Sequence, residues 1–498
     1  MANSEIADVL IVGSGIGGAT LAAGLAPTGA KIVILERGER LADTPEARDA
    51  RAIFQKGFYR PQESWIDGAG QEFNPGNYYY VGGNSKFYGA VLIRFRAEDF
   101  LTRRMAEGAT PGWPFAYDEL EPWYGKAEAL YSVRGAIGED ATEPRHSTPY
   151  PFPPVPDEPA IARVRERLKR IGLKPFSLAL GVDIETWLKG GATPWDAFPN
   201  TSAGKMDAET CGLKRALAYP NVTLRTGALA ERLLLAPDGK RIAGVEFRES
   251  GETRNVLAKI FAVAAGAVQS AVLLLRSSEQ GVANRSQMVG RNFMNHNASA
   301  VIGVDPRAVN DSVYQKTLGV NAFYLSDGQG GPPLGNIQLL GRVTAPILKA
   351  NVKLAPEWSL RWLSRHAVDW YAMSEDLPNF ESRVTIDGAN IRLDWKRSNW
   401  SAHVNLVKTW RERLRAAGYP IVLSRPFDRR TPSHQCGTVR IGIDGASAPL
   451  NPFCRAFDHE NLFVVDASFL PTSAAVNPAL TIAAQALRVA DHIAGNDL

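Results

Sequence analysis

Short apolar runs alternate with a glycine-rich turn at the start of the chain. Residues 9–12 (VLIV) form an uninterrupted apolar run, as do strands that are buried inside parallel sheets. Small residues over 20–26 favour a helix, and residues 31–35 (KIVIL) predict a second strand. A strand, a glycine-rich turn, a helix and a second strand in this order predict a βαβ unit.

The same patterning returns further along the chain. The turn Pro237-Asp238-Gly239 predicts a meander that joins strands at 222–224 and 242–247. Near the C-terminus a buried strand is again followed by a helix. Beyond the first unit, strands are predicted at 222–224, 242–247, 261–264 and 462–465, and helices at 117–133, 270–275 and 480–493.

Two stretches lack regular periodicity. Residues 54–89 are rich in Gly, Asn, Tyr and Pro and predict an extended loop, whereas the seven prolines of residues 144–159 exclude a regular helix. Cofactor-domain patterning occurs at both ends of the chain. We therefore expect a discontinuous cofactor-binding domain (1–105, 201–300 and 431–498) and a substrate-binding domain with excursions (106–200 and 301–430).

Composition narrows the class of protein. A chain of 498 residues is too long for one compact core, and its 56 basic and 52 acidic residues leave a net charge of only +4. Without a concentrated basic stretch, that balance argues against nucleic-acid binding. The three cysteines are widely spaced, which fits a reducing compartment and no metal site. We find no signal peptide and no apolar stretch long enough for a membrane span, so we expect a soluble cytoplasmic protein. The sequence gives no indication of oligomeric state.

The first glycine-rich turn fits the dinucleotide-binding fingerprint G-x-G-x-x-G. It consists of Gly13, Ser14, Gly15, Ile16, Gly17 and Gly18, lies between a predicted strand and helix, and is followed by Glu36 at the end of the next strand. The helix N-terminus would bind the pyrophosphate. Glu36 would accept hydrogen bonds from ribose hydroxyls and disfavour a 2′-phosphate, and we place Arg37 in the same binding set.

Two further elements favour FAD over NAD. A second glycine-rich segment supplies backbone amides that would reach the isoalloxazine end of an extended FAD molecule. A third element, Asp466 with Ala467, follows a strand and fits flavin ribityl or pyrophosphate recognition, with a simple helix N-cap as the alternative for Asp466. The second segment contributes Gly82, Gly83, Asn84, Ser85, Tyr88, Gly89 and Ala90.

These motifs resemble those of the glucose–methanol–choline (GMC) oxidoreductases along nearly the whole chain. The matching segments, in the order of that family, are GSGIGG with Glu36, GGNSKFYGA (82–90), GAVQSAVLLLRS (266–277), VGRNFMNH (289–296), EDLPNFESRV (375–384), SHQCGT (433–438) and VVDASFLPTSAAVNPALT (464–481).

The resemblance implies a two-domain fold, FAD as cofactor and a catalytic pair. The fold would be an α/β FAD-binding Rossmann-like domain plus an α+β substrate domain with an antiparallel sheet. Ala230 would contact the adenine through its backbone, and Asn477, Pro478 and Leu480 would contribute to the cofactor site. Some sugar-oxidising relatives carry a flavin-linking histidine where this chain has Phe87, so we expect non-covalent FAD.

Alcohol oxidation needs a base, because hydride leaves the carbon while the hydroxyl proton is removed. Histidine suits this role since its pKa lies near working pH. His434 lies in a polar glycine-containing loop and matches the family's catalytic histidine, and Asn477 matches its second catalytic position. We interpret His296 as a structural hydrogen-bonding residue and Cys436 as a packed thiol.

We therefore expect oxidation of a small alcohol to a carbonyl by hydride transfer to flavin N5, with oxygen or another electron acceptor. The resemblance is strongest to bacterial sugar and glycoside oxidases of the pyranose oxidase and glycoside 3-oxidase type, which favours a secondary sugar hydroxyl. Non-sugar alcohols, a flavin-containing lyase and an NAD-dependent dehydrogenase are the alternatives. The candidate aromatic residues for stacking on a sugar are Tyr324, Trp358, Trp362, Trp370, Tyr371, Trp395 and Trp400, with core packing as the alternative for each of them.

Overall fold

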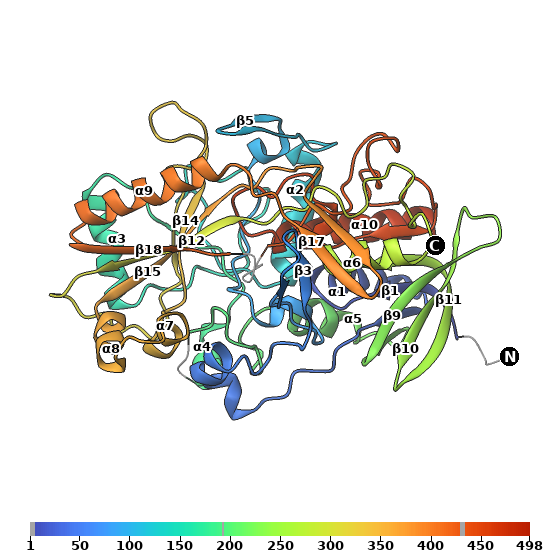
Figure 1. The fold of residues 1–498 in the computed structure, drawn as a ribbon, viewed down its shortest axis with the longest axis horizontal. Helices are drawn as coiled ribbons and strands as arrows, with labels where there is room; N and C mark the ends of the chain where they lie inside the picture. Colours follow the sequence, from blue (N-terminus) through green and yellow to red (C-terminus); the bar gives the residue numbers. More distant parts are fainter. Residues whose placement is uncertain (1–4, 192–193, 429–433) are drawn as a thin grey trace.

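The computed structural model describes residues 5–191, 194–428 and 434–498. Ser433, the first residue of the 433–438 motif, lies outside these ranges, whereas His434 lies inside them. Figure 1 shows two large sheets toward opposite ends of the molecule, with the C-terminus beside one of them.

The first sheet has seven strands and a parallel core. Strands β1, β2, β8, β11 and β19 run parallel. On the other side of β11, β10 pairs antiparallel with β11, and β9 pairs antiparallel with β10. The segments 9–12, 32–35, 260–263 and 462–464 of the parallel strands consist of buried Val, Ile, Leu, Phe and Ala residues, as the sequence predicts for strands covered on both faces. The strands are β1 (Glu5–Val12), β2 (Ile32–Leu35), β8 (Val222–Arg225), β9 (Ala228–Leu235), β10 (Ile242–Glu249), β11 (Glu252–Val263) and β19 (Leu462–Val464).

The predicted meander is partly wrong. β8 does not pair with β10; it lies beside β2 as a parallel strand, and the meander consists of β9, β10 and β11 around the turn at 237–239. The error arose because residues 228–235 (ALAERLLL) lack the alternation of apolar and polar residues that predicts a strand.

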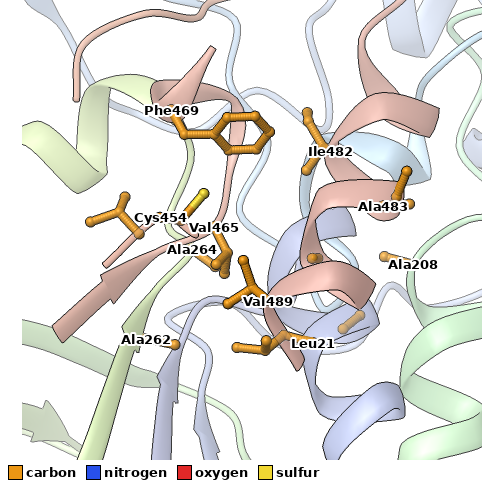
Figure 2. Close-up of a cluster of buried hydrophobic side chains, with 14 of the residues drawn as sticks. Leu21, Ala208, Ala262, Ala264, Cys454, Val465, Phe469, Ile482, Ala483 and Val489 are labelled. Carbon is orange, nitrogen blue, oxygen red and sulfur yellow. The ribbon is translucent and has the colours of Figure 1, made fainter. Parts of the chain in front are cut away.

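Helices from both ends of the chain pack together on this sheet. The helix α1 (Ile16–Leu25) contacts α10 (Ala479–Asn496), and α10 also contacts α2 (Tyr117–Leu130). Figure 2 shows Leu21 of α1, Val489 of α10, Ala262 of β11 and Val465 after β19 in one apolar cluster. The N-terminal and C-terminal segments therefore share one core, as expected for a discontinuous cofactor domain.

The second sheet has six antiparallel strands in the order β18-β12-β15-β14-β13-β7. The helices α3 (Pro159–Arg170) and α9 (Trp400–Ala416) share a hydrophobic cluster with it, in which Trp370 packs edge-on against Trp410 with ring centroids 4.8 Å apart. Its strands are β7 (Phe176–Ser177), β12 (Asn297–Val304), β13 (Leu318–Val320), β14 (Asn336–Leu339), β15 (Ala367–Ser374) and β18 (Ile421–Pro426).

Side chains alternate across β14. Ile337 and Leu339 belong to the cluster under α3 and α9, so Asn336 and Gln338 lie on the opposite face. That polar face of β14 faces Asn477 in the C-terminal segment, because Gln338 hydrogen-bonds to Asn477.

The stretch predicted as one extended loop contains short regular elements. Within 54–89, β3 (Trp65–Asp67) and β4 (Glu72–Phe73) join β16 (Arg383–Asp387) and β17 (Asn390–Asp394) in a four-stranded sheet, and η4 (Gly83–Lys86) is a 3₁₀ turn. The strands β5 (Arg103–Met105) and β6 (Gly108–Thr110) form a hairpin. The remaining α-helices are α4 (Ile184–Lys189), α5 (Lys214–Ala216), α6 (Ala267–Arg276), α7 (Ala345–Asn351) and α8 (Glu357–Arg365).

Within the described residues, none of the helices combines the length and the apolar character that crossing a membrane requires. The described residues also contain no cluster of His, Cys, Asp and Glu side chains suited to a metal ion.

Candidate active site

The turn between β1 and α1 is shaped to receive a phosphate. Gly13 has φ +100°, and a Cβ atom on Gly18 would lie 2.0 Å from the Gly13 carbonyl oxygen, so both positions require glycine. A Cβ atom on Gly15 would meet nothing within 4 Å. No side chain among the described residues caps α1 at Gly15. The first amides of α1 therefore face open space beside Gly15, where a helix N-terminus favours an anion.

Glu36 lies at the end of β2 and is bound to the same turn. Its carboxylate accepts hydrogen bonds from the Ser14 amide at 3.0 Å, the Ser14 hydroxyl at 2.6 Å and the Gly38 amide at 2.8 Å. Burial raises the pKa of Glu36, and these hydrogen bonds oppose that shift. The predicted ribose contact thus falls on a carboxylate whose position is already fixed next to the phosphate turn.

The second glycine-rich segment reaches the first one. Gly82 and Gly83 have φ values of +93° and +57°, and the Gly82 amide donates to the Ser14 hydroxyl at 3.0 Å. Asn84 accepts from the Tyr78 amide, while Ser85 donates to the Gly82 carbonyl and accepts from the Ala208 amide. The structure therefore brings these residues together with Gly13–Gly18, although 63 residues lie between Gly18 and Gly82 in the sequence.

The segment continues past Phe87 to a strained residue. The Phe87 ring stacks on Tyr78 with centroids 3.8 Å apart. The Tyr88 hydroxyl donates to the Met206 carbonyl, so this side chain is fixed by protein. Ala90 has φ +55°, an unusual value for a residue with a side chain, and such conformations concentrate at ligand sites.

The third element lies against the first turn from the other side. A Cβ atom on Gly17 would lie 1.9 Å from the Val465 carbonyl oxygen. The Asp466 carboxylate accepts from Gly266 and Ser270 through one oxygen and from Ser468 through the other. Asp466 therefore serves as the N-cap of η7 (Ala467–Phe469), the alternative considered from the sequence, and a direct contact between its carboxylate and FAD stays a prediction.

The remaining predicted cofactor residues surround these elements. Arg37 stacks over the Tyr79 ring at 3.8 Å from its centroid. Ala230 lies in β9, two residues after Ala228, whose amide donates to the Glu36 carbonyl at 2.9 Å. Pro478 caps α10, and Leu480 is buried in its first turn. Open space at Gly15, left-handed glycines and a fixed Glu36 fit a dinucleotide that extends from Glu36 toward Ala90.

The catalytic candidates meet, although 42 residues separate them along the chain. The Asn477 amide nitrogen Nδ2 lies 3.3 Å from His434 Nε2. The His434 backbone amide donates to Asn295 Oδ1 at 3.1 Å, and Cys436 pairs with Met294 through two backbone hydrogen bonds. The loop also connects to the third cofactor element, because the Gly437 amide donates to the Ala467 carbonyl at 3.2 Å.

Burial lowers the pKa of His434 well below its usual value, and His296 and Lys316 lower it further. His434 is therefore a neutral imidazole at neutral pH, the form that can accept a proton. Burial also raises the pKa of the Cys436 thiol well above its usual value, which agrees with its interpretation as a packed thiol.

Three residues that the sequence analysis did not assign to the site lie against it. His296 Nδ1 lies 2.7 Å from His434 Nδ1, so the histidine that we interpreted as a structural hydrogen-bonding residue contacts the catalytic candidate directly. Gln338 Nε2 donates to Asn477 Oδ1 at 2.9 Å. Lys316 forms a 2.6 Å ion pair with Asp196, and both side chains lie where a Cβ atom on Gly89 would be. Of these three residues, only His296 belongs to a sequence motif: it is the last residue of the 289–296 segment, directly after Asn295.

The aromatic residues considered for sugar stacking lie mostly elsewhere. Trp370 is fully buried in the cluster under α9, and the Tyr324 hydroxyl donates to Asp99 in the interior. Trp358 is 74% exposed on α8. Trp395 donates through Nε1 to Asp376. Core packing and surface exposure therefore account for these rings, and they carry no argument about substrate.

The fold and the converging elements define a dinucleotide-dependent oxidoreductase with a Rossmann-like domain and an antiparallel substrate-domain sheet. Comparison with known proteins specifies the class further. Two models of the GMC oxidoreductase family match residues 188–298 and 378–486, and a model of NAD(P)-binding Rossmann-like domains matches residues 11–59. The chain belongs to the GMC oxidoreductase family, and it is an FAD-dependent enzyme acting on CH–OH groups.

Whole-length similarities agree with this family. The chain is 29% identical to the 6'''-hydroxyparomomycin C oxidase of Streptomyces lividus, over 98% of this chain and 92% of the relative. It is 25% identical to the 2-methyl-1,2-propanediol dehydrogenase of Mycolicibacterium austroafricanum, over 99% and 96%. The crystal structure of pyridoxine 4-oxidase from Mesorbium loti superimposes with a TM-score of 0.70 at 19% identity, over 99% of this chain and 100% of that chain, which shows the two-domain fold.

Proposed function

We propose that the protein oxidises a secondary hydroxyl of a sugar or glycoside to a ketone, with His434 as the base and Asn477 as a hydrogen-bond donor to the same oxygen. The observation that carries the two roles is the approach of His434 Nε2 and Asn477 Nδ2 to 3.3 Å at a partly buried position. One substrate oxygen beside the two nitrogens would lie within hydrogen-bonding distance of both.

The two side chains would act on the same substrate oxygen in different ways. The hydroxyl proton passes to the Nε2 lone pair of His434 as the carbonyl double bond forms and hydride leaves the carbon. The Asn477 N–H group stabilises negative charge that develops on the oxygen, as donors in a preorganised buried site do. When bound, FAD accepts the hydride.

The cofactor site belongs to the same proposal. We infer that the phosphates of FAD lie at Gly15 and the first turn of α1, that Glu36 binds the adenosine ribose, and that the backbone of Gly89 and Ala90 lines the flavin ring. The open space at Gly15 and the converging glycines support this arrangement. The side chain of Phe87 cannot form a bond to the flavin, which supports non-covalent binding.

A carbohydrate substrate is supported by one relative and by the polar side chains around His434 and Asn477. The Streptomyces lividus relative is named as an oxidase of an aminoglycoside, a molecule built from sugars. Around the catalytic pair, Gln338, Lys316 and Asp196 supply polar groups suited to hydroxyl recognition. A small non-sugar alcohol is the second candidate, because the Mycolicibacterium austroafricanum relative is named for a diol.

A substrate panel with an artificial electron acceptor tests the proposal. It should contain glucose, alkyl and aryl glycosides, an aminoglycoside, 1,2-propanediol, choline and benzyl alcohol. We expect turnover with at least one glycoside and formation of a ketone on its ring, identified by mass spectrometry after borodeuteride reduction. Activity on the diol or benzyl alcohol with none on any carbohydrate would replace the sugar assignment by the second candidate.

Anaerobic addition of the best donor separates oxidation from a lyase reaction. An oxidoreductase bleaches the flavin absorbance because the cofactor takes up the hydride. A lyase would convert its substrate while the absorbance stays unchanged, and that result would refute oxidation of the donor.

A further inference from the structure

The catalytic pair lies inside a continuous chain of hydrogen bonds, and each end of that chain is a group that can only accept. At one end, His296 Nε2 lies 2.8 Å from the backbone carbonyl of Ser473. At the other end, Asn321 Nδ2 donates at 2.7 Å to the carboxylate of Asp140, which forms an ion pair with Arg96. These two anchors determine the direction of every hydrogen bond between them.

The contact with the Ser473 carbonyl determines which ring nitrogen carries the hydrogen in both His296 and His434. Because a carbonyl oxygen only accepts, the hydrogen on His296 must be on Nε2. Burial lowers the pKa of His296 to about 4, so the ring is neutral and its Nδ1 carries a lone pair. The 2.7 Å contact between the two Nδ1 atoms then requires that His434 Nδ1 donates, which leaves the lone pair of His434 on Nε2.

The Asp140 end gives the same result independently. Asn321 donates to Asp140, so its Oδ1 accepts from Asn336 Nδ2 at 2.7 Å. Asn336 Oδ1 in turn accepts from Gln338 Nε2 at 3.2 Å. We call this series of hydrogen-bonded amides the relay. Asp140 lies far from its three amides in the sequence, and all four side chains are buried.

The relay continues into the catalytic pair. The second hydrogen on Gln338 Nε2 goes to Asn477 Oδ1 at 2.9 Å. The amide of Asn477 is thereby oriented with Nδ2 toward His434 Nε2. A donor at that position requires an acceptor on the ring, so the second route also places the lone pair on Nε2.

We propose that this chain of hydrogen bonds holds His434 as the Nδ1–H tautomer, and that His296 and Gln338 are positioning residues for the catalytic pair. The proposal rests on the function proposed above, in which His434 Nε2 takes the hydroxyl proton. The wrong tautomer would point an N–H group at the substrate hydroxyl and have no lone pair to accept its proton.

The tautomer can be observed without substrate by ¹⁵N NMR of the FAD-loaded enzyme labelled at its seven histidines. A ring nitrogen with a hydrogen and one with a lone pair resonate in well-separated regions. We expect hydrogen on Nδ1 for His434 and on Nε2 for His296, with resonances assigned by their loss in His434→Gln and His296→Leu. Hydrogen on Nε2 of His434 in the wild-type enzyme would overturn the proposal.

Two variants of similar side-chain volume separate positioning from folding. His296→Asn keeps an acceptor, since its Oδ1 replaces Nδ1, whereas His296→Leu removes it. With the best donor of the panel, we expect His296→Leu to slow anaerobic flavin reduction by at least about tenfold, within the range of general-base effects. The substrate Kd should change less than about threefold, and His296→Asn should recover most of the rate.

His403→Leu is the matched control, because His403 is also buried and hydrogen-bonds two serines in the substrate domain. Equal losses in His296→Leu, His296→Asn and His403→Leu would show a packing effect and overturn the positioning role. If instead His434→Ala retains turnover, the proposed base is wrong, while the NMR result still decides the tautomer.

Discussion

The surroundings of His434 favour its neutral ring, the form that the proposed base needs, and at the same time lower its basicity. Burial, His296 and Lys316 all favour the neutral ring, so the lone pair is present at neutral pH without any proton having to leave. The same surroundings disfavour the imidazolium that forms when the substrate proton arrives. In the proposed mechanism, a hydrogen bond from Asn477 to the reacting oxygen compensates on the substrate side, and the short distance between the two side chains supports this role.

Replacing His434 should remove turnover and leave the cofactor bound. We expect His434→Ala to lower the rate of flavin reduction by about 10²–10⁴, because a positioned base contributes that much. Asn477→Ala should cost less, about 10² or below, since it removes one donor and leaves the base in place. Stopped-flow reduction and the flavin-to-protein absorbance ratio measure the two quantities. A His434→Ala enzyme that keeps more than about a tenth of the wild-type rate would exclude it as the base.

The lowered pKa of His434 also predicts a pH profile. A base works deprotonated, so activity is lost as pH falls through its pKa, and here that pKa lies below 6.5. We expect kcat/KM for the best donor to stay level between about pH 8 and 6.5 and to fall only under more acidic conditions. An acid limb at or above 6.5 that disappears in His434→Ala would show that burial does not depress this group in the working enzyme.

At the scale of elements, the glycines of the turn between β1 and α1 (Gly13–Gly18, the phosphate turn) serve two purposes: some are required for folding, and Gly15 is expected to be required for ligand binding. Gly13 and Gly18 are required by the protein itself, since side chains there would meet backbone or need a left-handed conformation. Gly15 has φ −66° and ψ −172°, values that alanine adopts freely, and its added Cβ atom would meet no protein atom within 4 Å. We therefore expect that a bound pyrophosphate, and not the fold of the protein, requires glycine at this position.

The substitution Gly15→Ala should therefore preserve the fold and weaken FAD. We expect an unchanged circular dichroism spectrum and at least about tenfold weaker FAD retention, equivalent to about 1.4 kcal/mol. Gly18→Ala is the contrasting variant, because its Cβ atom would lie 2.0 Å from the Gly13 carbonyl oxygen and should impair folding. Full FAD content in a well-folded Gly15→Ala protein would contradict a pyrophosphate at this turn.

Elements with strong local signals were predictable, and elements defined by their partners were not. The fingerprint, the buried parallel strands and the final strand and helix all carry local patterns, and the structure contains them close to their predicted bounds. The strand β9 and the parallel placement of β8 depend on neighbours that no local pattern names. The His434–Asn477 pair came from motif resemblance. The relay through Gln338, Asn336 and Asn321 has no motif, because only the pleat of β14 and its neighbours brings those amides together.

At the scale of the whole molecule, the cofactor site is distributed along the chain. The phosphate turn, Glu36, the 82–90 segment and Asp466 meet only because segments from both ends share one core (Figure 2). The domain boundaries expected from the sequence stay a prediction. The four-stranded sheet joins β3 and β4, which we assigned to the cofactor domain, with β16 and β17, which we assigned to the substrate domain.

This distribution predicts that FAD leaves when the fold is lost. Each contact expected for FAD is non-covalent and depends on tertiary structure. The position where some relatives carry a linking histidine is Phe87, whose ring is stacked on Tyr78. The cysteines do not replace it as nucleophiles, because burial raises the pKa of Cys211, Cys436 and Cys454 and keeps them as thiols.

Acid precipitation of the purified yellow enzyme should therefore release all of the flavin into the supernatant, at about one equivalent per chain. The supernatant should match authentic FAD by chromatography and mass, and the washed pellet should show no flavin fluorescence under denaturing electrophoresis. Free FAD added to a colourless protein before precipitation controls for trapping in the pellet. Flavin that stays with the denatured chain, with a peptide mass increased by that of FAD, would show a covalent link and identify the residue that forms it.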